Sequence, residues 1–409
     1  MRGIAGVLRK VLQNTNPNEM LGCTPYSIQK ILLWYGIEVS AGYDFVYGVR
    51  VNNESKLPDD GLGYLGISVP LLKNMLMDKQ RATLRKAQIF RDASEQQRLL
   101  ILNDLLLDAL KAYYNWSYAY NEYQIYSQAT DVALLRFNAT VQANLFGDRA
   151  AIDTTEALTQ LQSRQFQLND TRLLFLNSGL ALHNYLWMEN EQPRLFDTTI
   201  TPAQLTSEFT RQELALTQLD ELVYQLKQTH PVLLNYNFKL RQLDIERRLK
   251  IENLKPTLNA KYNLLSERFN FQRNIGIIFT NNYKFGINFS MPLAFMQGRG
   301  ALRLTKIEIQ NTRYAIDYKL QELTTKLKSY FNELINLQQQ TKLYQETVRG
   351  FKTLFDGETI RFNNGESSLF LVNARENLYL DSQVKLRELQ AKYFKTEAEL
   401  KWAAGNISR

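Results

Sequence analysis

The segment YKFGINFSM at residues 283–291 alternates strictly between apolar and polar or small residues. Successive side chains of a β-strand point to opposite faces, so such a strand presents one apolar and one polar face. A second segment with this alternation begins at Tyr43. Strands of this kind are typical of a membrane-embedded barrel, which has lipid outside and water inside. The residues that we expect to face lipid are Tyr43, Phe45, Tyr47, Tyr283, Phe285, Ile287 and Phe289.

The composition excludes several other classes of protein. The chain has no run of 18 or more apolar residues, so a membrane-spanning helix is not expected. Its net charge of +8 fits solvated helix faces better than a nucleic-acid groove, because basic and aromatic residues do not cluster together. Cys23 is the only cysteine, which excludes an internal disulfide. No apolar segment precedes Cys23 as a lipoprotein signal requires, so lipidation there is not expected.

The distribution of proline divides the chain into two similar halves. None of the nine prolines lies between Pro70 and Pro193 or after Pro292. Because proline is poorly tolerated inside a helix, these two stretches favour long helices. Arg81 and Arg299 begin matching segments in the two halves, at an offset of 218 residues. We therefore predict an internal duplication with strand-to-helix transitions at Pro70, Pro292, Arg81 and Arg299.

Each half is predicted to contain two strands, a long helix, a tight turn and a second long helix. Apolar residues recur every three or four positions after residue 297, interrupted at Thr305, Thr312 and Thr341. This spacing indicates a coiled-coil stripe. A helix over residues 297–363 would be on the order of 100 Å long at 1.5 Å per residue.

The segment between the halves has a different pattern. It holds four of the prolines, a short expected strand at Phe196–Ile200, and two ordinary expected helices at Leu205–Leu226 and Leu233–Leu254. The predicted division is residues 1–40 as an atypical amino-terminal segment, 41–192 as the first repeat, 193–256 as a mixed equatorial domain, and 257–405 as the second repeat.

Four strands are too few to close a membrane barrel, since the smallest such barrels have about eight. An open sheet edge in lipid would leave backbone amide and carbonyl groups unpaired, at a cost of several kcal/mol each. If the strands are embedded in a membrane, copies of the same chain must complete the sheet.

The duplicated strand-Pro-Leu elements, the helix starts at Arg81 and Arg299, and the segment FNNGESSLFLVNAR at residues 362–375 give the chain a resemblance to the TolC family of outer-membrane efflux proteins. The resemblance covers residues 41–405. It implies a fold that is mainly α with membrane β: a homotrimer whose chains share one β-barrel in the outer membrane, continued by an α-helical barrel in the periplasm. It also implies an inner-membrane pump and a periplasmic adaptor protein as partners.

The amino end departs from that family, which carries an export signal and another long helix before its first strand. Residues 1–40 match neither pattern. Either the chain begins inside a longer reading frame, or its amino end has been replaced.

The resemblance also suggests functional positions. Glycine ends each long helix at the helix-to-helix turns; the resemblance implies that these turns also dock the adaptor, and plain helix-ending glycines are the alternative. Acidic residues after the second turn narrow the periplasmic entrance in the family, but Leu371 and Asn373 occupy the matching positions here. Asp153 and Glu156 are the corresponding acids of the first half, and acids that merely favour a helix start are the alternative. The docking residues are Gly147, Asp148, Gly365, Glu366 and Ser367.

Enzyme chemistry has no support in the sequence. His183 and His230 lack partners at metal-ligand spacing and are expected to be ordinary surface histidines. We find no catalytic triad, phosphate loop or dinucleotide motif, and expect no cofactor. The tyrosines from Tyr113 to Tyr126 are expected to pack in the helical stripe.

The predicted function is a passive exit duct for a tripartite efflux system or type I secretion, exporting drugs, metal ions or polypeptides. The alternative is a structural coiled-coil scaffold with a soluble hairpin sheet.

Overall fold

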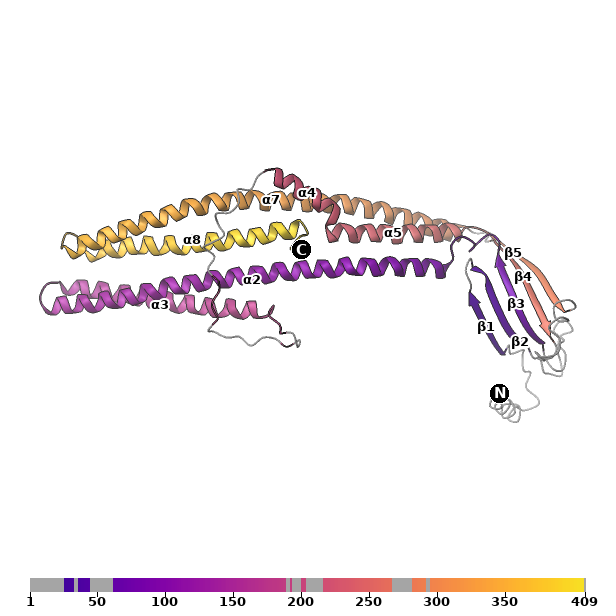
Figure 1. Ribbon diagram of the computed structural model, residues 1–409, viewed down its shortest axis with the longest axis horizontal. Coiled ribbons are helices and arrows are strands. Elements are labelled where there is room, and N and C mark those ends of the chain that lie inside the picture. The colour runs from indigo at the N-terminus through magenta and orange to yellow at the C-terminus, as the bar shows by residue number, and fades with distance from the viewer. Residues whose placement is uncertain are drawn as a thin grey trace, which may run out of the picture. The chain divides into compact units, whose positions relative to one another are not determined.

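The computed structural model describes residues 26–32, 36–44, 62–188, 192, 200–203, 216–266, 282–291 and 295–407 (Figure 1). The chain divides into two compact units, each built from two separate stretches of sequence. The first unit comprises Met1–Arg91 and Phe238–Arg313, and the second comprises Asp92–Asn237 and Tyr314–Arg409.

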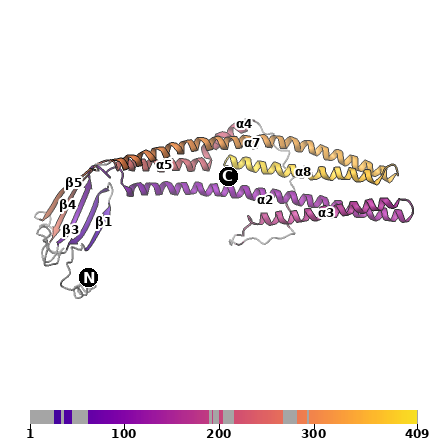
Figure 2. The same ribbon diagram turned by 180° about the vertical axis from the view of Figure 1, so that it is seen from behind.

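The first unit contains one antiparallel sheet, which Figure 2 shows from behind. Its five strands follow one another in sequence order, and the pairing of β3 with β4 joins the two halves of the chain. The strands are β1 (Tyr26–Leu32), β2 (Glu38–Asp44), β3 (Leu62–Pro70), β4 (Thr257–Ser266) and β5 (Tyr283–Ser290).

The sheet has one strand more than the four predicted. The additional strand is β1, which lies in the segment predicted to be atypical. Tyr43 lies in β2, which begins at Glu38, five residues before the strand expected from Tyr43. Phe45, Tyr47 and the proline at position 292 lie outside the described residues.

Long helices dominate the rest of the structure. α2 (Lys79–Leu145) and α7 (Met296–Asn363) have 67 and 68 residues, as the sequence predicted, and each is followed by a helix about half as long, where a second long helix was expected. The last residue of α2 and the first residue of the helix after it have counterparts 218 residues later. This is the offset expected from a duplicated helical hairpin. The shorter successors are α3 (Ala151–His183) and α8 (Leu369–Ala403).

The two helices between the halves are α4 (Leu216–Thr229) and α5 (Pro231–Glu252). The second agrees with its prediction to within two residues at each end. The first begins later than predicted among the described residues, and residues 204–215 lie outside them. The strand expected at 196–200 also lies outside the described residues except for Ile200, which is not in a strand.

The stripe predicted along α7 is confirmed, because none of its residues is exposed. In the second unit, Leu323, Leu327 and Phe331 are fully or almost fully buried against residues of α4, α5 and α8. The threonines that interrupt the stripe are also buried. Thr341 donates its hydroxyl to the Leu337 carbonyl at 2.7 Å, so a polar residue is accommodated without an unpaired hydroxyl.

Candidate functional site

The sheet has one continuous apolar face. Directly opposed residues of antiparallel strands share a face, and the register aligns Val39, Ile67, Tyr262 and Phe285 across β2 to β5. A second such row contains Ala41, Leu65, Leu264 and Tyr283. The largest side chains of this face are strongly exposed: Tyr283 is 56%, Phe285 59%, Ile287 60% and Phe289 64% accessible.

The opposite face carries mainly polar or small residues, apart from Tyr64 and Leu265, which are paired across β3 and β4. Ser40, Gly66, Asn263 and Lys284 stand in one row across four strands. A Cβ atom at Gly66 would collide with the side-chain oxygen of Asn263, so a larger residue there would force the asparagine side chain to move away from β3. Apart from the Tyr64–Leu265 pair, the sheet therefore has an apolar face and a polar face, as the alternation predicted.

Arg81 organises the connection from β3 to α2. Its Nε donates to Asp78 Oδ2 at 2.6 Å and its Nη1 to the Met75 carbonyl at 3.0 Å. Asp78 in turn accepts the backbone N–H of Arg81 at 2.7 Å, which caps the first turn of the helix. Arg299 plays a different part in the second half, because its guanidinium lies over the Phe295 ring, 5.5 Å from the centroid.

The two helix-to-helix turns share one backbone geometry. Gly147 and Gly365 have φ of 82° and 78°, values that favour glycine. Each turn makes the same two hydrogen bonds. The glycine N–H donates to the carbonyl three residues back, and the N–H of the next residue donates to the carbonyl five residues back, as in a Schellman motif. Arg149, after the first turn, lies over the Phe362 ring before the second at 4.3 Å.

The predicted docking residues are mostly on the surface of these turns. Both glycines, Asp148 and Glu366 are exposed, whereas Ser367 is partly buried and donates to Glu358. Several large apolar side chains beside the turns are also exposed. Exposed apolar side chains that lie together on a protein surface mark a site of interaction. They are Leu145 at 73%, Phe146 at 79%, Ile152 at 70% and Phe370 at 67%.

A cluster of charged and polar side chains joins α2, α3 and α8. Arg136 of α2 donates to both carboxylate oxygens of Glu376 of α8, at 2.8 and 3.1 Å. It also donates to Asn373 Oδ1 at 3.1 Å. Asn373 Nδ2 then donates to Glu156 of α3 at 3.0 Å. Two predicted entrance residues, Glu156 and Asn373, are thus brought together in one hydrogen-bonded chain.

Arg164 of α3 is the second cation of this cluster. It lies 3.9 Å from Glu376 Oε2 and donates to Gln167 at 2.8 Å and to Asn377. The Arg164 and Glu376 side chains are only 4% and 5% exposed. Burial lowers the pKa of Arg164, and the Glu376 carboxylate opposes that shift. One carboxylate therefore holds two arginines from different helices, which makes Glu376 the central residue of the cluster.

The other predicted entrance residues lie outside this cluster. Asp153 is partly exposed in the first turn of α3, where its charge favours the helix start. Leu371 is 43% exposed, and its backbone N–H donates to the Ser368 side chain at 3.4 Å. Arg136, Arg164 and Glu376 were not predicted. Arg164 and Glu376 are the only charged residues among the buried positions of α3 and α8, and a charge at such a position is the signal that marks them.

The histidines and tyrosines have structural roles. His230 was predicted to be at the surface, but it is only 3% exposed. Its Nδ1 accepts the Val232 N–H at 3.3 Å, so it caps the start of α5. Phe175 stacks on Trp116 and Tyr123, with ring centroids 6.1 and 5.9 Å apart, which supports packing for the tyrosine run.

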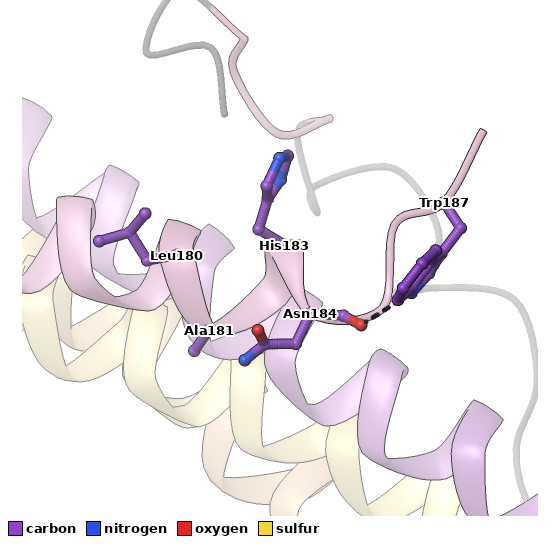
Figure 3. A pocket seen from close by; sticks show the side chains of 5 residues that line it. All are labelled: Leu180, Ala181, His183, Asn184 and Trp187. Atoms are coloured by element: carbon purple, nitrogen blue, oxygen red, sulfur yellow. Dashed lines mark hydrogen bonds between the residues drawn. The ribbon is translucent and has the colours of Figure 1, made fainter. Parts of the chain in front are cut away.

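A shallow pocket at the end of α3 offers little to a ligand. It is lined by Leu180, Ala181, His183, Asn184 and Trp187, whose indole N–H donates to the Asn184 carbonyl at 3.1 Å (Figure 3). His183 is the single titratable side chain in that lining. In the described part of the chain, no three His, Cys, Asp or Glu side chains are arranged to hold a metal ion. None of the described helices has the length and apolar composition needed to cross a membrane.

Comparison with known proteins shows what the chain is similar to. Residues 222–406 match the family model of the outer membrane efflux proteins. This part of the chain is therefore similar to that family. No curated protein sequence matches the chain.

Solved structures of outer membrane channels share its fold. The Campylobacter jejuni channel CmeC has 15% sequence identity, with a TM-score of 0.65 over 94% of this chain and 78% of that chain. The open-state Neisseria gonorrhoeae channel MtrE has 15% identity and a TM-score of 0.68, covering 99% and 85%. The Vibrio cholerae outer membrane protein VceC has 15% identity and a TM-score of 0.66, covering 99% and 90%.

Proposed function

We propose that this chain forms a trimeric exit duct in the bacterial outer membrane. The single observation that carries the proposal is the exposed apolar face of the sheet, where Phe285, Ile287 and Phe289 are each about 60% accessible. A contiguous surface of this kind marks contact with a partner or a membrane. The polar opposite face would line a water-filled lumen.

Closure of the barrel requires several chains. Four antiparallel strands from each of three protomers would give a twelve-stranded wall, within the range of bacterial outer-membrane barrels. The long helices would continue the duct into the periplasm, in the division into repeats 41–192 and 257–405 around the equatorial segment 193–256. The family and the fold of the solved channels support this arrangement.

The helix turns are the proposed docking surface for a periplasmic adaptor, which would connect the duct to an inner-membrane pump. Phe146 and Phe370 beside the two turns are 79% and 67% exposed. Large exposed apolar side chains next to Gly147 and Gly365 fit a protein partner better than solvent. Adaptor binding would bury them.

The cluster around Glu376 is the proposed gate. Its Arg136 and Arg164 contacts hold α8 against α2 and α3. A buried ion pair opens only at substantial cost if one partner is left without the other. A closed entrance would therefore be held by the cluster until adaptor contact moves the helical hairpins apart.

Reconstitution into planar lipid bilayers tests the proposed function. We expect discrete ohmic conductance steps from a heat-modifiable trimer. A protein that stays monomeric and never conducts would contradict the proposal and would favour the scaffold alternative.

A further inference from the structure

Strand β1 occupies the edge of β2 that barrel closure would need. β2 pairs with β3 along one edge and with β1 along the other. The outer edge of β5 is the far end of the described sheet. In a ring of protomers, the strand facing β5 of one chain is therefore β1 of the next, unless β1 leaves its place.

Strand direction argues against a ring that keeps β1. Every neighbouring pair in the sheet is antiparallel, so β1 and β5 run in the same direction. Three five-stranded sheets would give fifteen strands and three parallel junctions. Bacterial outer-membrane barrels have even numbers of antiparallel strands. Without β1, β5 would meet β2 of the next protomer in antiparallel fashion, and the total would be twelve.

The sequence of β1 also fits the wall poorly. In the register of the sheet, Gln29 stands opposite Ala41 in the apolar row, and Leu32 stands opposite Glu38 in the polar row. The register is further broken between Tyr26 and Gln29. β5 has no such defect, since its apolar and polar residues alternate over its whole length. A barrel wall requires strands whose apolar and polar residues alternate regularly, and β1 lacks that regularity.

The lengths and faces of β2 and β5 suit each other. They have seven and eight residues. Val39 and Ala41 of the β2 apolar row are smaller than Phe285, Ile287 and Phe289 of the β5 row, so a large and a small row would meet side by side. When β5 replaces β1, the β2 backbone would lose its hydrogen bonds to β1 and gain equivalent bonds to β5. The number of hydrogen bonds made by β2 would therefore stay nearly the same.

We propose that β1 is a temporary edge strand, which covers β2 in the unassembled chain and is displaced by β5 of a second copy during assembly. The inference rests on the proposed trimeric barrel. It assigns β1 a protective role, because an uncovered edge strand pairs readily with wrong partners. It also makes the β2 edge the surface at which one protomer recognises the next.

Disulfide trapping tests the exchange in the full chain with Cys23→Ser. Lys30→Cys with Ser40→Cys places two thiols at directly opposed positions of β1 and β2. Ser68→Cys with Lys261→Cys does the same for β3 and β4 on the same polar face, as the matched control. Both pairs are oxidised in the monomer and again after assembly in lipid vesicles.

We expect the control pair to close in both states, and the 30–40 pair to close in the monomer but not in the trimer. Oxidising the 30–40 pair before assembly should abolish trimer formation, and reduction should restore it. Ser40→Cys should then form crosslinks between chains with a cysteine placed in turn along the polar row of β5, at Lys284, Asn288 or Ser290.

Two results would overturn the exchange alone: a 30–40 pair that closes fully in the trimer, or one that fails to close in the monomer while the control closes. If the reduced protein forms no oligomer in lipid at all, the proposed trimeric duct fails, and the exchange fails with it. The readouts therefore separate the two proposals.

Discussion

Replacing Glu376 by glutamine removes the one carboxylate that holds two arginines of the proposed gate. The substitution keeps the shape of the side chain but leaves Arg136 and Arg164 facing a neutral amide. The Arg136 contacts at 2.8 and 3.1 Å are charge-assisted and strongly shielded, since the Glu376 side chain is 5% exposed and that of Arg136 15%. Glutamine can still accept one of these hydrogen bonds.

The expected loss of unfolding free energy is about 3 kcal/mol, the lower end of the range for a buried pair that loses one partner. With a slope of about 3 kcal/mol per molar urea, the midpoint of urea unfolding should fall by about 1 M. Far-ultraviolet circular dichroism would follow the loss of helix. If the cluster is the gate, the same variant should also raise the open probability in lipid bilayers.

Glu388→Gln is the matched control on the same helix. Its ion pair with Lys385 is equally short, at 2.7 Å, but both side chains are about half exposed, so the loss should be within about 0.5 kcal/mol. The reasoning would be refuted if Glu376→Gln and Glu388→Gln shifted the urea midpoint equally.

Three further predictions concern the helices, and two of them include a control substitution. Burial lowers the pKa of His230 to about 4, below its unfolded value of about 6.5. As the pH falls from about 6.5 to about 4, the unfolded chain binds the extra proton first, so the free energy of unfolding should fall by up to about 3 kcal/mol. His230→Asn, which can still cap α5, should lose this pH dependence in urea titrations. Gly365→Ala should lower the free energy of unfolding by about 1 kcal/mol, and with it the thermal midpoint, because alanine resists positive φ. Gly350→Ala inside α7 should raise the midpoint. Leu327→Ala should lower the free energy of chemical unfolding by about 2–5 kcal/mol. The matched control Leu343→Ala removes an exposed leucine of the same helix and should lower it by less than about 1 kcal/mol. Equal losses would show that the α7 stripe is not a core.

Sequence patterns predicted the helices well because their determinants are local. The absence of proline allowed helices of 67 and 68 residues, and glycines at 147 and 365 marked the turns through their tolerance of positive φ. The stripe of α7 was visible because burial repeats with the helical period. Its threonines did not break it, since their hydroxyls bond within the helix.

β1 escaped prediction because its period is broken. Ile28 and Ile31 are an odd number of residues apart, and the irregularity between Tyr26 and Gln29 shifts the register. The regular alternation of β5 has no such interruption, so it was found. His230 was misplaced for a different reason: its burial depends on helices that are distant in sequence.

The charged cluster escaped prediction because its partners are far apart in sequence. Arg136 and Glu376 are separated by 240 residues, and nothing in either segment alone identifies the other. Glu156 and Asn373 were named as entrance candidates from the resemblance and from the repeat, which relates them at 217 residues. The resemblance located the region, and the structure supplied the pairing.

Spin labels placed in turn along β5 of the reconstituted protein test the central claim most directly. The account predicts a period of two, with labels at Phe285, Ile287 and Phe289 accessible to oxygen dissolved in lipid and labels at Lys284 and Asn288 accessible to a water-soluble nickel complex. Labels on both faces that meet only water, or an apolar row shielded from both reagents, would contradict it.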